Sequence, residues 1–576
     1  MSGCYGSDLI VDLLHRYEVP YAALNPGSTF RGLHDSIVNY GGNRPEIIEC
    51  PHEEVAVQIA HGYARATGRP MVAIVHDVVG LLHASMAIYY AYLDRAPVIV
   101  MGGTGPLDPT RRRPHIDWIH TALPQGQAVR DYVKWDYQPQ GAEDVVESFA
   151  RAYRVALTDP QGPVYLCYDA GFQEDQLDHL PPIPSPERVT PTRLAPEPEA
   201  IERLAGWLVR ARQPVLVAEH VGRRPEAVAA LVELAELLGA AVVDRGQRFC
   251  FPNTHPLNLT GAEDLLPGAD LVVALEVRDL FGALSAVDRT RRQAQPVIGS
   301  DCRLVEIGLG DLGLRSWPQD QQRLLPVDLS ILGDAALALP LLIDACRRLA
   351  TAEDRERFAR RAREHTAAHA ALRAGWAERA RSLAGEVPVA TAHLAAELWE
   401  VVRDTDWVLA GNTLRDWTLR LWDIDRPGRH PGKGLGTATE IGMALGVALA
   451  HRGSGRLVVD VQPDGDLMFD LGALWVASHH RIPMLAVMFD NRSYYNDWEH
   501  QVLVARDRGR DPEMAYLGME IDRPAPDFAG VARALGWYAE GPVERPSDLR
   551  GALTRARDVV LGEGRPALVD VVCQFR

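Results

Sequence analysis

The sequence has few cysteines and no long apolar run, and each shortage excludes a class of protein. Its seven cysteines are scattered and odd in number, and none has a Cys-x-x-Cys partner. This pattern fits a reducing compartment and excludes a disulfide framework. No apolar stretch approaches the roughly 20 residues of a membrane span, and the first residues lack the basic and apolar regions of a signal peptide. We therefore expect a cytoplasmic protein with no membrane partner.

An excess of positive charge is also missing. The formal net charge is −17 at pH 7. Nucleic-acid-binding proteins need a basic face, so the charge argues against a nucleic-acid partner. One basic segment, at 111–120, stands out with the sequence Arg-Arg-Arg-Pro-His-Ile-Asp-Trp-Ile-His. It is either a solvated basic turn or a site for an acidic or phosphorylated substrate tail.

Apolar runs alternate with amphipathic stretches through most of the chain. The 576 residues exceed one domain, and a hydrophobic content of 47% is enough for several cores. Alternation of strand and helix predicts parallel sheets covered by helices. We expect an α/β fold with three doubly wound parallel-sheet domains. The predicted parts are a first domain, a proline-rich linker, a central domain, a charged connecting helix and a third domain, at 1–180, 181–198, 199–350, 351–385 and 386–576.

Two polar segments, at 463–466 and 490–491, each follow an apolar run that predicts a buried strand. Asn491 lies 27 residues after Asp464. The carboxyl ends of neighbouring parallel strands share one edge of the sheet, where doubly wound folds bind cofactors. One carboxylate and one amide oxygen suit Mg²⁺ and leave room for waters and phosphate oxygens. The pair therefore predicts a magnesium site, although Asp464 alone could simply cap a helix.

The residues after Asp464 are also suited to an anion. Gly465 lets the backbone approach a phosphate closely. The N–H groups of Gly465, Asp466 and Leu467 are then expected to point at the anion from the start of a helix.

These segments resemble the diphosphate-binding domain of thiamine-diphosphate enzymes, whose pattern is Gly-Asp-Gly and then Asn-Asn. Pro463 replaces the first glycine and Asp490 the first asparagine. The metal-ligand positions Asp464 and Asn491 are kept, and the resemblance implies the backbone carbonyl of Ser493 as a third ligand. The lost glycine affects backbone freedom and the lost asparagine is not a ligand. Thiamine diphosphate and Mg²⁺ are therefore still expected to bind.

The first domain resembles the pyrimidine-binding domain of the same enzymes. Residues 51–54 (Pro-His-Glu-Glu) and 60–68 match a His-Glu pair and a Gly-Tyr-Ala-Arg-x-Thr-Gly run. The resemblance implies that Glu53 protonates N1′ of the aminopyrimidine, so that an imino group removes the thiazolium C2 proton. The resulting ylid is the nucleophile and electron sink of the cofactor. Glu54 is the alternative if the alignment slips by one residue, and a glutamate there also suits a helix dipole.

Two further segments are similar to cofactor-contacting parts of these enzymes. Residues 432–436 (Gly-Lys-Gly-Leu-Gly) resemble the segment that bends the cofactor. The resemblance implies that Leu435 wedges under the cofactor and that Gly434 contacts it; Leu435 is otherwise ordinary core. Asn412 and Thr413 match the other phosphate-side loop.

The substrate side is similar to benzoylformate decarboxylases. Residues 25–28 (Asn-Pro-Gly-Ser) resemble their Pro-Gly-Ser turn, and His76, which lies 23 residues after Glu53, matches a catalytic histidine. The resemblance implies that Ser28 and His76 handle protons and a developing alkoxide. Their alternatives are a capping serine and a structural histidine. Asp77 is expected to orient His76 or to bind substrate.

Two regions leave the substrate open. The segment that covers the thiazolium in the family corresponds to 494–500, which makes Tyr494, Asp497 and Glu499 candidate substrate residues. The central domain resembles one that binds FAD or the adenosine (ADP) part of CoA in some relatives. It lacks a Gly-x-Gly-x-x-Gly turn, so neither ligand is assigned.

Taken together, the resemblance implies a thiamine-diphosphate- and Mg²⁺-dependent C–C lyase or carboligase of the 2-hydroxyacyl-CoA lyase kind. It acts through a C2 ylid and a carbanion on a 2-oxoacid, aldehyde or acyl-CoA. The alternatives are acetolactate synthase, a benzoylformate-type 2-oxoacid decarboxylase and a non-catalytic cofactor-binding paralogue. In the family, Glu53 of one subunit meets the cofactor held by another, which implies a homodimer or homotetramer.

Overall fold

The chain forms two compact units, each built from segments that are distant in sequence. The computed structural model describes residues 4–113, 120–288, 293–313, 315, 319–414, 416–434 and 436–575. The first unit comprises Met1–Thr192, Leu435–Arg452 and Asp470–Ile482; the second comprises Arg193–Gly434, Gly453–Phe469 and Pro483–Arg576. Two helices from the C-terminal part of the sequence, α14 (Glu440–Ala450) and α16 (Ala473–His479), therefore belong to the first unit.

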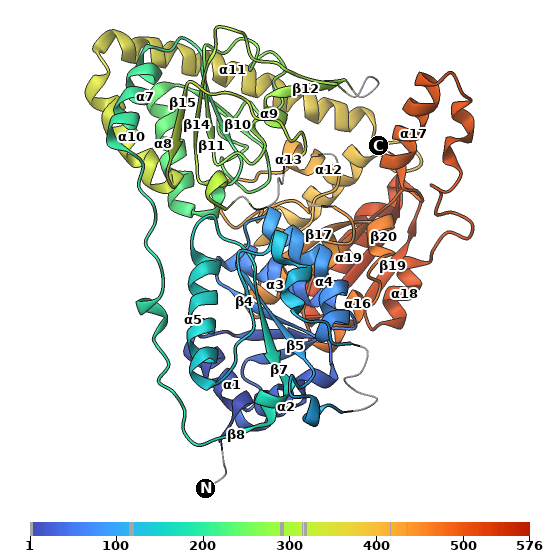
Figure 1. The fold of residues 1–576 in the computed structure, drawn as a ribbon. Helices are drawn as coiled ribbons and strands as arrows, with labels where there is room; N and C mark the ends of the chain where they lie inside the picture. The colour runs from blue at the N-terminus through green and yellow to red at the C-terminus, as the bar shows by residue number, and fades with distance from the viewer. Residues whose placement is uncertain are drawn as a thin grey trace. The chain divides into compact units, whose positions relative to one another are not determined.

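The first unit contains a six-stranded parallel sheet with the order β3-β2-β4-β5-β7-β6. Its strands β4, β5 and β7 are labelled in Figure 1. Its strands are Glu46–Glu49 (β3), Tyr21–Leu24 (β2), Met71–Val75 (β4), Val98–Thr104 (β5), Val164–Asp169 (β7) and Asp136–Tyr137 (β6). Its other helices are Gly6–Arg16 (α1), Arg31–Asp35 (α2), Glu53–Thr67 (α3), Asp77–Leu93 (α4), Ala142–Leu157 (α5) and Ala170–Glu174 (α6).

The second unit contains two five-stranded parallel sheets. The first has the order β10-β9-β11-β14-β15, formed by Ala241–Asp244, Pro214–Ala218, Leu271–Leu275, Arg303–Gly308 and Leu329–Leu332. The second has the order β16-β17-β18-β20-β19, formed by Trp407–Leu409, Leu457–Pro463, Leu485–Asp490, Ala567–Val572 and Tyr538–Val543. The helices are Pro198–Arg210 (α7), Pro225–Leu238 (α8), Leu280–Ala283 (α9), Ala335–Leu349 (α10), Ala352–Ser382 (α11), Thr391–Val402 (α12), Trp417–Leu421 (α13), Asp464–Leu467 (α15), Tyr495–Asp507 (α17), Phe528–Ala534 (α18) and Pro546–Glu563 (α19).

The expected fold class is confirmed, because all three main sheets are parallel and alternate with helices. Strands β4, β9 and β11 are buried at every position, as expected for strands covered on both faces. The proposed domain limits stay a prediction.

Helix α3, which begins with Glu53, packs closely on α14. A Cβ added to Gly62 would lie 2.0 Å from the Met443 carbonyl oxygen, and one added to Gly446 would lie 2.1 Å from the Ile59 oxygen. Glycine at these positions therefore lets the two helix backbones touch. The Gln58 amide also donates to the Asp470 carboxylate at 3.1 Å. These contacts fix the position of α3 and hence of its first residue.

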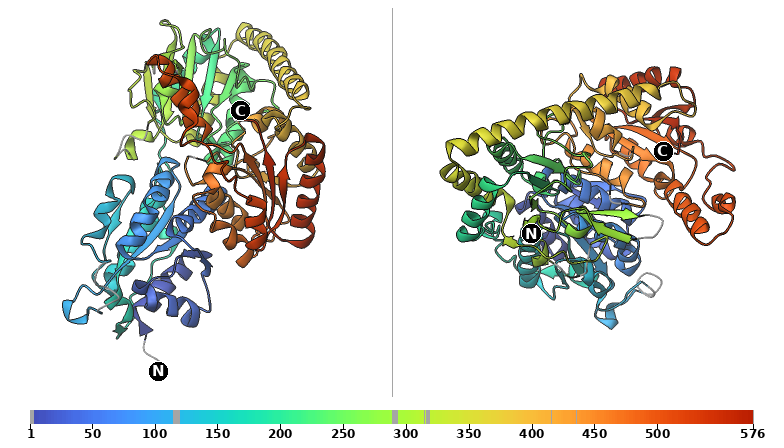
Figure 2. Two further views of the ribbon diagram at one scale, coloured as in Figure 1. Left: turned by 90° about the vertical axis from the view of Figure 1, so that its right-hand side faces the viewer. Right: turned by 90° about the horizontal axis from the view of Figure 1, so that it is seen from above.

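Helix α11 (Ala352–Ser382) lies within 351–385, the segment expected to form a charged connecting helix. It is drawn as one continuous helix in Figure 2 (yellow). Thr351 and Asp354 form a capping box at its start. The buried guanidinium of Arg361 donates to the carbonyl oxygens of Gly239 and Ala211. One basic side chain thus ties the helix to the ends of α8 and α7.

Two expectations concern compartment and membrane. All seven cysteines are free thiols in the structure. Within the described part of the chain, no helix combines the length and apolar character needed to cross a bilayer.

A buried carboxyl group sits inside strand β17. Asp460 is fully buried, and neither carboxyl oxygen has a hydrogen-bond partner among the described residues. Burial, and secondarily the nearby charge of Asp466, raises the pKa of Asp460 to about 8. The group therefore favours its neutral form in the folded protein.

Replacing Asp460 by Asn is expected to make stability less sensitive to pH. Between its ordinary pKa of 3.8 and about 8, folded Asp460 holds a proton that the unfolded chain has lost, so the free energy of unfolding falls as pH rises. The slope from this group is about 1.4 kcal/mol per pH unit. Thermal melts of parent and variant at pH 5 and pH 8 measure the effect. We expect the difference in melting temperature, variant minus parent, to be larger at pH 8 than at pH 5. An identical pH dependence of the melting temperature in both proteins contradicts the assignment.

Candidate active site

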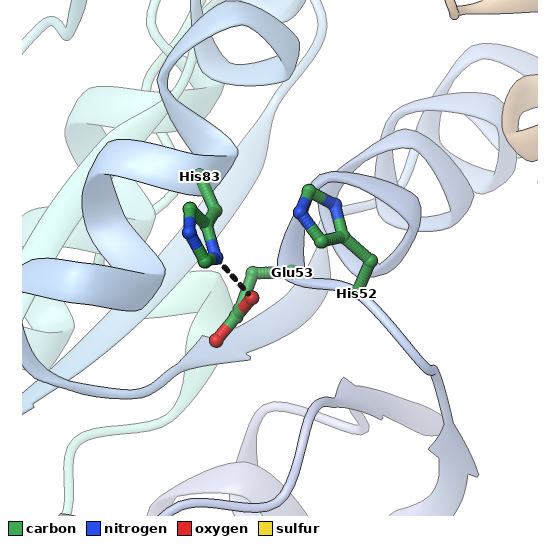
Figure 3. Close-up of side chains that lie close together, drawn as sticks. All are labelled: His52, Glu53 and His83. Atoms are coloured by element: carbon green, nitrogen blue, oxygen red, sulfur yellow. Dashed lines mark hydrogen bonds and ion pairs between the residues drawn. The ribbon is translucent and has the colours of Figure 1, made fainter. Parts of the chain in front are cut away.

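Glu53 is the first residue of α3 and is buried, with 5% of its surface exposed. The preceding His52 caps the helix by accepting a hydrogen bond from the Glu54 N–H at 3.4 Å. Oε2 of Glu53 lies 3.1 Å from Nδ1 of His83 (Figure 3). A Cβ added to Gly80 would lie only 2.8 Å from Oε1. Since Glu54 is more exposed, the structure favours Glu53 as the carboxyl group of a water-poor site.

His83 was not singled out by the sequence analysis. It lies on α4, two helical turns after His76, and its ring stacks on His52 with centroids 4.9 Å apart and planes 20° from parallel. Its side chain is 48% exposed. In the sequence, His83 stands out as a polar ring in a largely apolar helical segment. This pattern does not reveal its contact with Glu53.

The predicted 25–28 turn and His76 lie together in the structure. A Cβ added to Gly27 would lie 2.4 Å from His76 Cβ, so the turn packs directly on this residue. Thr29 Oγ1 is 3.0 Å from His76 Nδ1, and His120 Nδ1 is 3.4 Å from His76 Nε2. Thr29, rather than the predicted Ser28, makes the hydroxyl contact, while Ser28 begins the adjacent 3₁₀ turn, Ser28–Phe30, without a side-chain capping bond.

Asp77 is fully buried and has a φ of 45°, in the left-handed region. Its carboxylate accepts from the Val78 N–H at 2.9 Å and from the Thr121 hydroxyl at 3.4 Å. These contacts hold the start of α4 and the segment after His120 in place. They favour a role for Asp77 in orienting its surroundings over direct contact with a substrate.

The described part of the basic segment is paired with acidic side chains. Arg111 forms an ion pair with Asp175 at 2.8 Å, and Arg113 forms one with Glu174 at 2.8 Å. Residues 114–119 of this segment lie outside the described residues. The pairs favour the interpretation as a solvated basic turn.

In the second unit, Asp464, Asn491 and Ser493 lie together, as predicted. Their strands β17 and β18 are parallel neighbours, with Pro463 paired to Phe489. The Ser493 N–H lies 3.2 Å from Asp464 Oδ2 and 3.0 Å from Asn491 Oδ1, and the Ser493 hydroxyl donates to the same Asn491 oxygen at 3.1 Å. The carboxylate and amide oxygens therefore converge on one buried loop.

A second carboxyl group adjoins this set. Burial, then the charge of Asp490 and a hydrogen bond with it, raises the pKa of Asp464 to about 8. Burial also raises the pKa of Asp490 itself. The pKa of Asp570 is raised to about 7 by burial and then by the charge of Asp490. Adjacent buried carboxyl groups disfavour ionisation unless a cation is present, and hard oxygen donors are those that Mg²⁺ prefers. The donor set therefore fits magnesium.

The predicted diphosphate-side residues differ from the expectation at Gly465, whose N–H was expected to point at an anion. The N–H of Gly465 donates to Asp464 Oδ1 at 2.8 Å, and α15 is only four residues long. Asp466 accepts from the Gln462 amide at 3.2 Å, and Leu467 is fully buried. A Cβ added to Gly465 would lie 2.7 Å from the Tyr494 ring, so only glycine fits beneath this ring.

The other phosphate-side candidates are held by backbone and helix contacts. The Thr413 hydroxyl donates to the Val461 carbonyl oxygen at 2.8 Å. Asn412 is buried and its Oδ1 accepts from Thr418 at the start of α13. The Thr413 contact places this loop beside β17, the strand that leads to Asp464.

The 432–436 segment is only partly described. Gly434 follows Lys433, whose ammonium group forms an ion pair with Asp416 at 2.6 Å. Leu435, the predicted wedge, lies outside the described residues. Gly436 has a φ of 148°, and a Cβ there would lie 2.8 Å from the Tyr90 hydroxyl oxygen.

The candidate substrate residues after Asn491 differ in their surroundings. Tyr494 is 38% exposed, lies over Gly465 and directly follows Ser493. Asp497 and Glu499 lie on α17, which has no buried residue. Tyr494 contacts Gly465, a predicted cofactor residue.

A cavity of about 350 Å³ lies in the second unit beside β10. It is lined by polar and aromatic residues, among them Asp244, Arg245, Arg248, Trp376, Arg420 and Lys433. Neither FAD nor CoA is assigned to this cavity.

Comparisons with known proteins identify two domains of one family. The N-terminal TPP binding domain of thiamine pyrophosphate enzymes matches residues 5–125, and their C-terminal TPP binding domain matches residues 410–571. Thiamine pyrophosphate (TPP) is another name for thiamine diphosphate.

Two curated relatives match nearly the whole chain. The chain is 27% identical to benzoylformate decarboxylase of Pseudomonas aeruginosa, over 91% of each protein. It is 23% identical to a probable acetolactate synthase large subunit of Methanocaldococcus jannaschii, over 98% of this chain and 91% of that protein.

Solved structures show the same fold. Benzoylformate decarboxylase from Polynucleobacter necessarius superposes with a TM-score of 0.76 at 20% identity, over 99% of both chains. A 4-hydroxybenzoylformate decarboxylase from Rhodococcus jostii superposes with a TM-score of 0.73 at 19% identity, over 100% of both chains. With both TPP binding domains in order along one chain, this protein belongs to the thiamine pyrophosphate enzymes.

Proposed function

We propose that this protein is a thiamine-diphosphate- and Mg²⁺-dependent 2-oxoacid decarboxylase of the benzoylformate type. The observation that carries the proposal is the packing of His76 against the 25–28 turn, in the same unit as buried Glu53. The 27% identity to a benzoylformate decarboxylase over most of both chains supports it. The names of the relatives favour this alternative and acetolactate synthase over the 2-hydroxyacyl-CoA lyase that the sequence resemblance placed first.

The predicted metal ligands and Glu53 have defined parts in this proposal. The bound cofactor supplies a carbon nucleophile and an electron sink for decarboxylation. Asp464, Asn491 and the Ser493 carbonyl would hold Mg²⁺, and with it the diphosphate. Glu53 would hold and release a proton at its carboxyl oxygens, in surroundings that exclude most water.

His76 would act on the substrate. Its ring is held at Nδ1 by Thr29 and at Nε2 by His120, so its orientation is fixed before the substrate arrives. If the longer contact, 3.4 Å to His120, opens, the freed Nε2 can donate a hydrogen bond to a 2-oxoacid or move a proton at physiological pH. Ser28, in the same turn, would contribute a hydroxyl group.

Acetolactate synthase is the second candidate. It is favoured by the match to an archaeal relative over 98% of this chain. In both cases we propose a homodimer or homotetramer, because in the resemblance Glu53 of one subunit serves the cofactor held by another.

Product analysis separates these functions. Purified protein with Mg²⁺ and thiamine diphosphate is offered benzoylformate, pyruvate, or formyl-CoA with an aldehyde. We expect benzaldehyde and carbon dioxide from benzoylformate. Acetolactate from pyruvate as the main product supports the second candidate, and product from formyl-CoA alone overturns the proposal.

Replacing His76 by Ala is expected to lower kcat for benzoylformate by about 10²-fold or more, because a positioned acid–base group contributes on this scale. The matched control is His34→Ala, since His34 is exposed on α2. Steady-state kinetics compares kcat of both variants with that of the parent. A parental kcat in the His76 variant means that this residue has no acid–base role in the reaction.

A further inference from the structure

The hydroxyl group of Thr29 is buried against the ring of His76. Its Oγ1 lies 3.0 Å from Nδ1 of the imidazole, and only 1% of Thr29 is exposed. Both residues belong to the first unit. Because this contact is already buried within one chain, a cofactor or a second subunit that approaches from outside cannot bring water to it.

Strand β5 and helix α6 fix the position of Thr29. A Cβ added to Gly103 on β5 would lie 2.4 Å from Thr29 Oγ1, so glycine leaves the room that the hydroxyl group needs. The Gln173 amide donates to the Thr29 carbonyl oxygen at 2.9 Å and accepts from the Leu33 N–H at 3.3 Å. Gln173 is itself fully buried on α6. The hydroxyl group is therefore held beside the imidazole before any ligand binds.

The direction of this hydrogen bond follows from the donors and acceptors at hand. A threonine hydroxyl has one proton to donate, and a neutral imidazole carries its proton on one of two nitrogens. Among the residues that the structure describes, His76 Nδ1 is the one hydrogen-bond partner of Thr29 Oγ1. A proton on Nδ1 would leave the buried hydroxyl proton without an acceptor, which is costly. The hydroxyl group therefore donates to Nδ1, and Nε2 of neutral His76 carries the ring proton.

We propose that Thr29 is a positioning residue that sets the tautomer of His76, so that Nε2 presents an N–H to the substrate. The proposal rests on the proposed function, in which His76 acts on a 2-oxoacid. The carboxylate of such a substrate only accepts hydrogen bonds, so it requires a donor. In the structure Nε2 lies 3.4 Å from His120 Nδ1, a long contact that a substrate oxygen can replace. The opposite tautomer would present a lone pair to the substrate and repel its oxygens.

Two variants separate the hydroxyl group from the shape of the side chain. Thr29→Val keeps the branched shape and removes the donor, whereas Thr29→Ser keeps the hydroxyl group. In full-length protein with thiamine diphosphate and Mg²⁺, we expect kcat for benzoylformate to fall about tenfold in Thr29→Val, the scale of one hydrogen bond, and to stay within about twofold of the parent in Thr29→Ser. The matched control is Thr366→Val, since Thr366 is exposed on α11. We expect it to keep the parental kcat.

Nitrogen NMR of the same protein, labelled with ¹⁵N-histidine, reports the tautomer without any 2-oxoacid. The His76 signals are those that disappear in His76→Ala. In the parent and in Thr29→Ser we expect Nδ1 without a proton and Nε2 with one. In Thr29→Val we expect the form protonated at Nδ1 to increase.

The two readouts distinguish this inference from the function on which it rests. A proton on Nδ1 in the parent, or the same tautomer in Thr29→Val as in the parent, overturns the role of Thr29. Equal losses of kcat in Thr29→Val and Thr29→Ser also overturn it, because they indicate a purely structural effect. The expected tautomers in a parent that does not decarboxylate benzoylformate contradict only the substrate assignment.

Discussion

Replacing Glu53 by Gln is expected to lower turnover by about 10²- to 10⁴-fold while thiamine diphosphate and Mg²⁺ still bind. The amide has nearly the same shape as the carboxyl group, so the contacts of α3 with Gly80 and His83 can persist. It cannot, however, take up or release a proton at physiological pH. Steady-state kinetics measures the loss of turnover, and calorimetric titration measures cofactor binding.

The neighbouring Glu54 provides a matched control. It is the same residue type, one position later and more exposed, and it is the site that a one-residue slip in the resemblance would select. Glu54→Gln is expected to retain activity close to that of the parent. A severe loss in the Glu54 variant together with full activity in the Glu53 variant would move the acid–base role to Glu54.

Replacing Asp464 by Ala is expected to weaken binding of Mg²⁺ and thiamine diphosphate by at least about 10²-fold. Loss of an outer-sphere partner of a metal already costs 10- to 100-fold, and a direct ligand matters more. The change also removes the oxygens that accept from the Gly465 and Ser493 N–H groups. The cofactor-induced rise in melting temperature should therefore disappear, because a ligand stabilises the folded state only when it binds.

Asp507→Ala is the control for this variant. Asp507 is exposed at the end of α17, so its loss removes one carboxylate of the same type without touching the β17–β18 edge. Calorimetric titration with Mg²⁺ and thiamine diphosphate compares both variants with the parent. Equal affinity in Asp464→Ala means that the metal assignment is wrong.

The strands of this fold could be predicted where burial is complete. Strands β4, β9 and β11 coincide with uninterrupted apolar runs of the sequence, because strands covered on both faces carry no polar interruption. The two-residue strand β6 offers no such signal. The assignment of α14 to the first unit depends on contacts such as Gly62 with Met443, which are far apart in sequence.

The residues of the candidate site could be predicted where they belong to a sequence motif. Asp464 and Asn491 follow from strand ends and spacing, and the structure brings their oxygens together at Ser493. The contacts of His83 with Glu53 and of Thr29 with His76 arise from tertiary packing that neither spacing nor resemblance reveals. The substrate was the least predictable feature, because cofactor chemistry is shared across a fold while a few site side chains select the substrate.

Release of carbon dioxide from benzoylformate by the purified full-length protein tests the central claim most directly. The account predicts release that requires both thiamine diphosphate and Mg²⁺ and that is lost in the Glu53→Gln variant. Release that continues without the cofactor, or no release from benzoylformate by a protein that has bound cofactor and Mg²⁺, would contradict it.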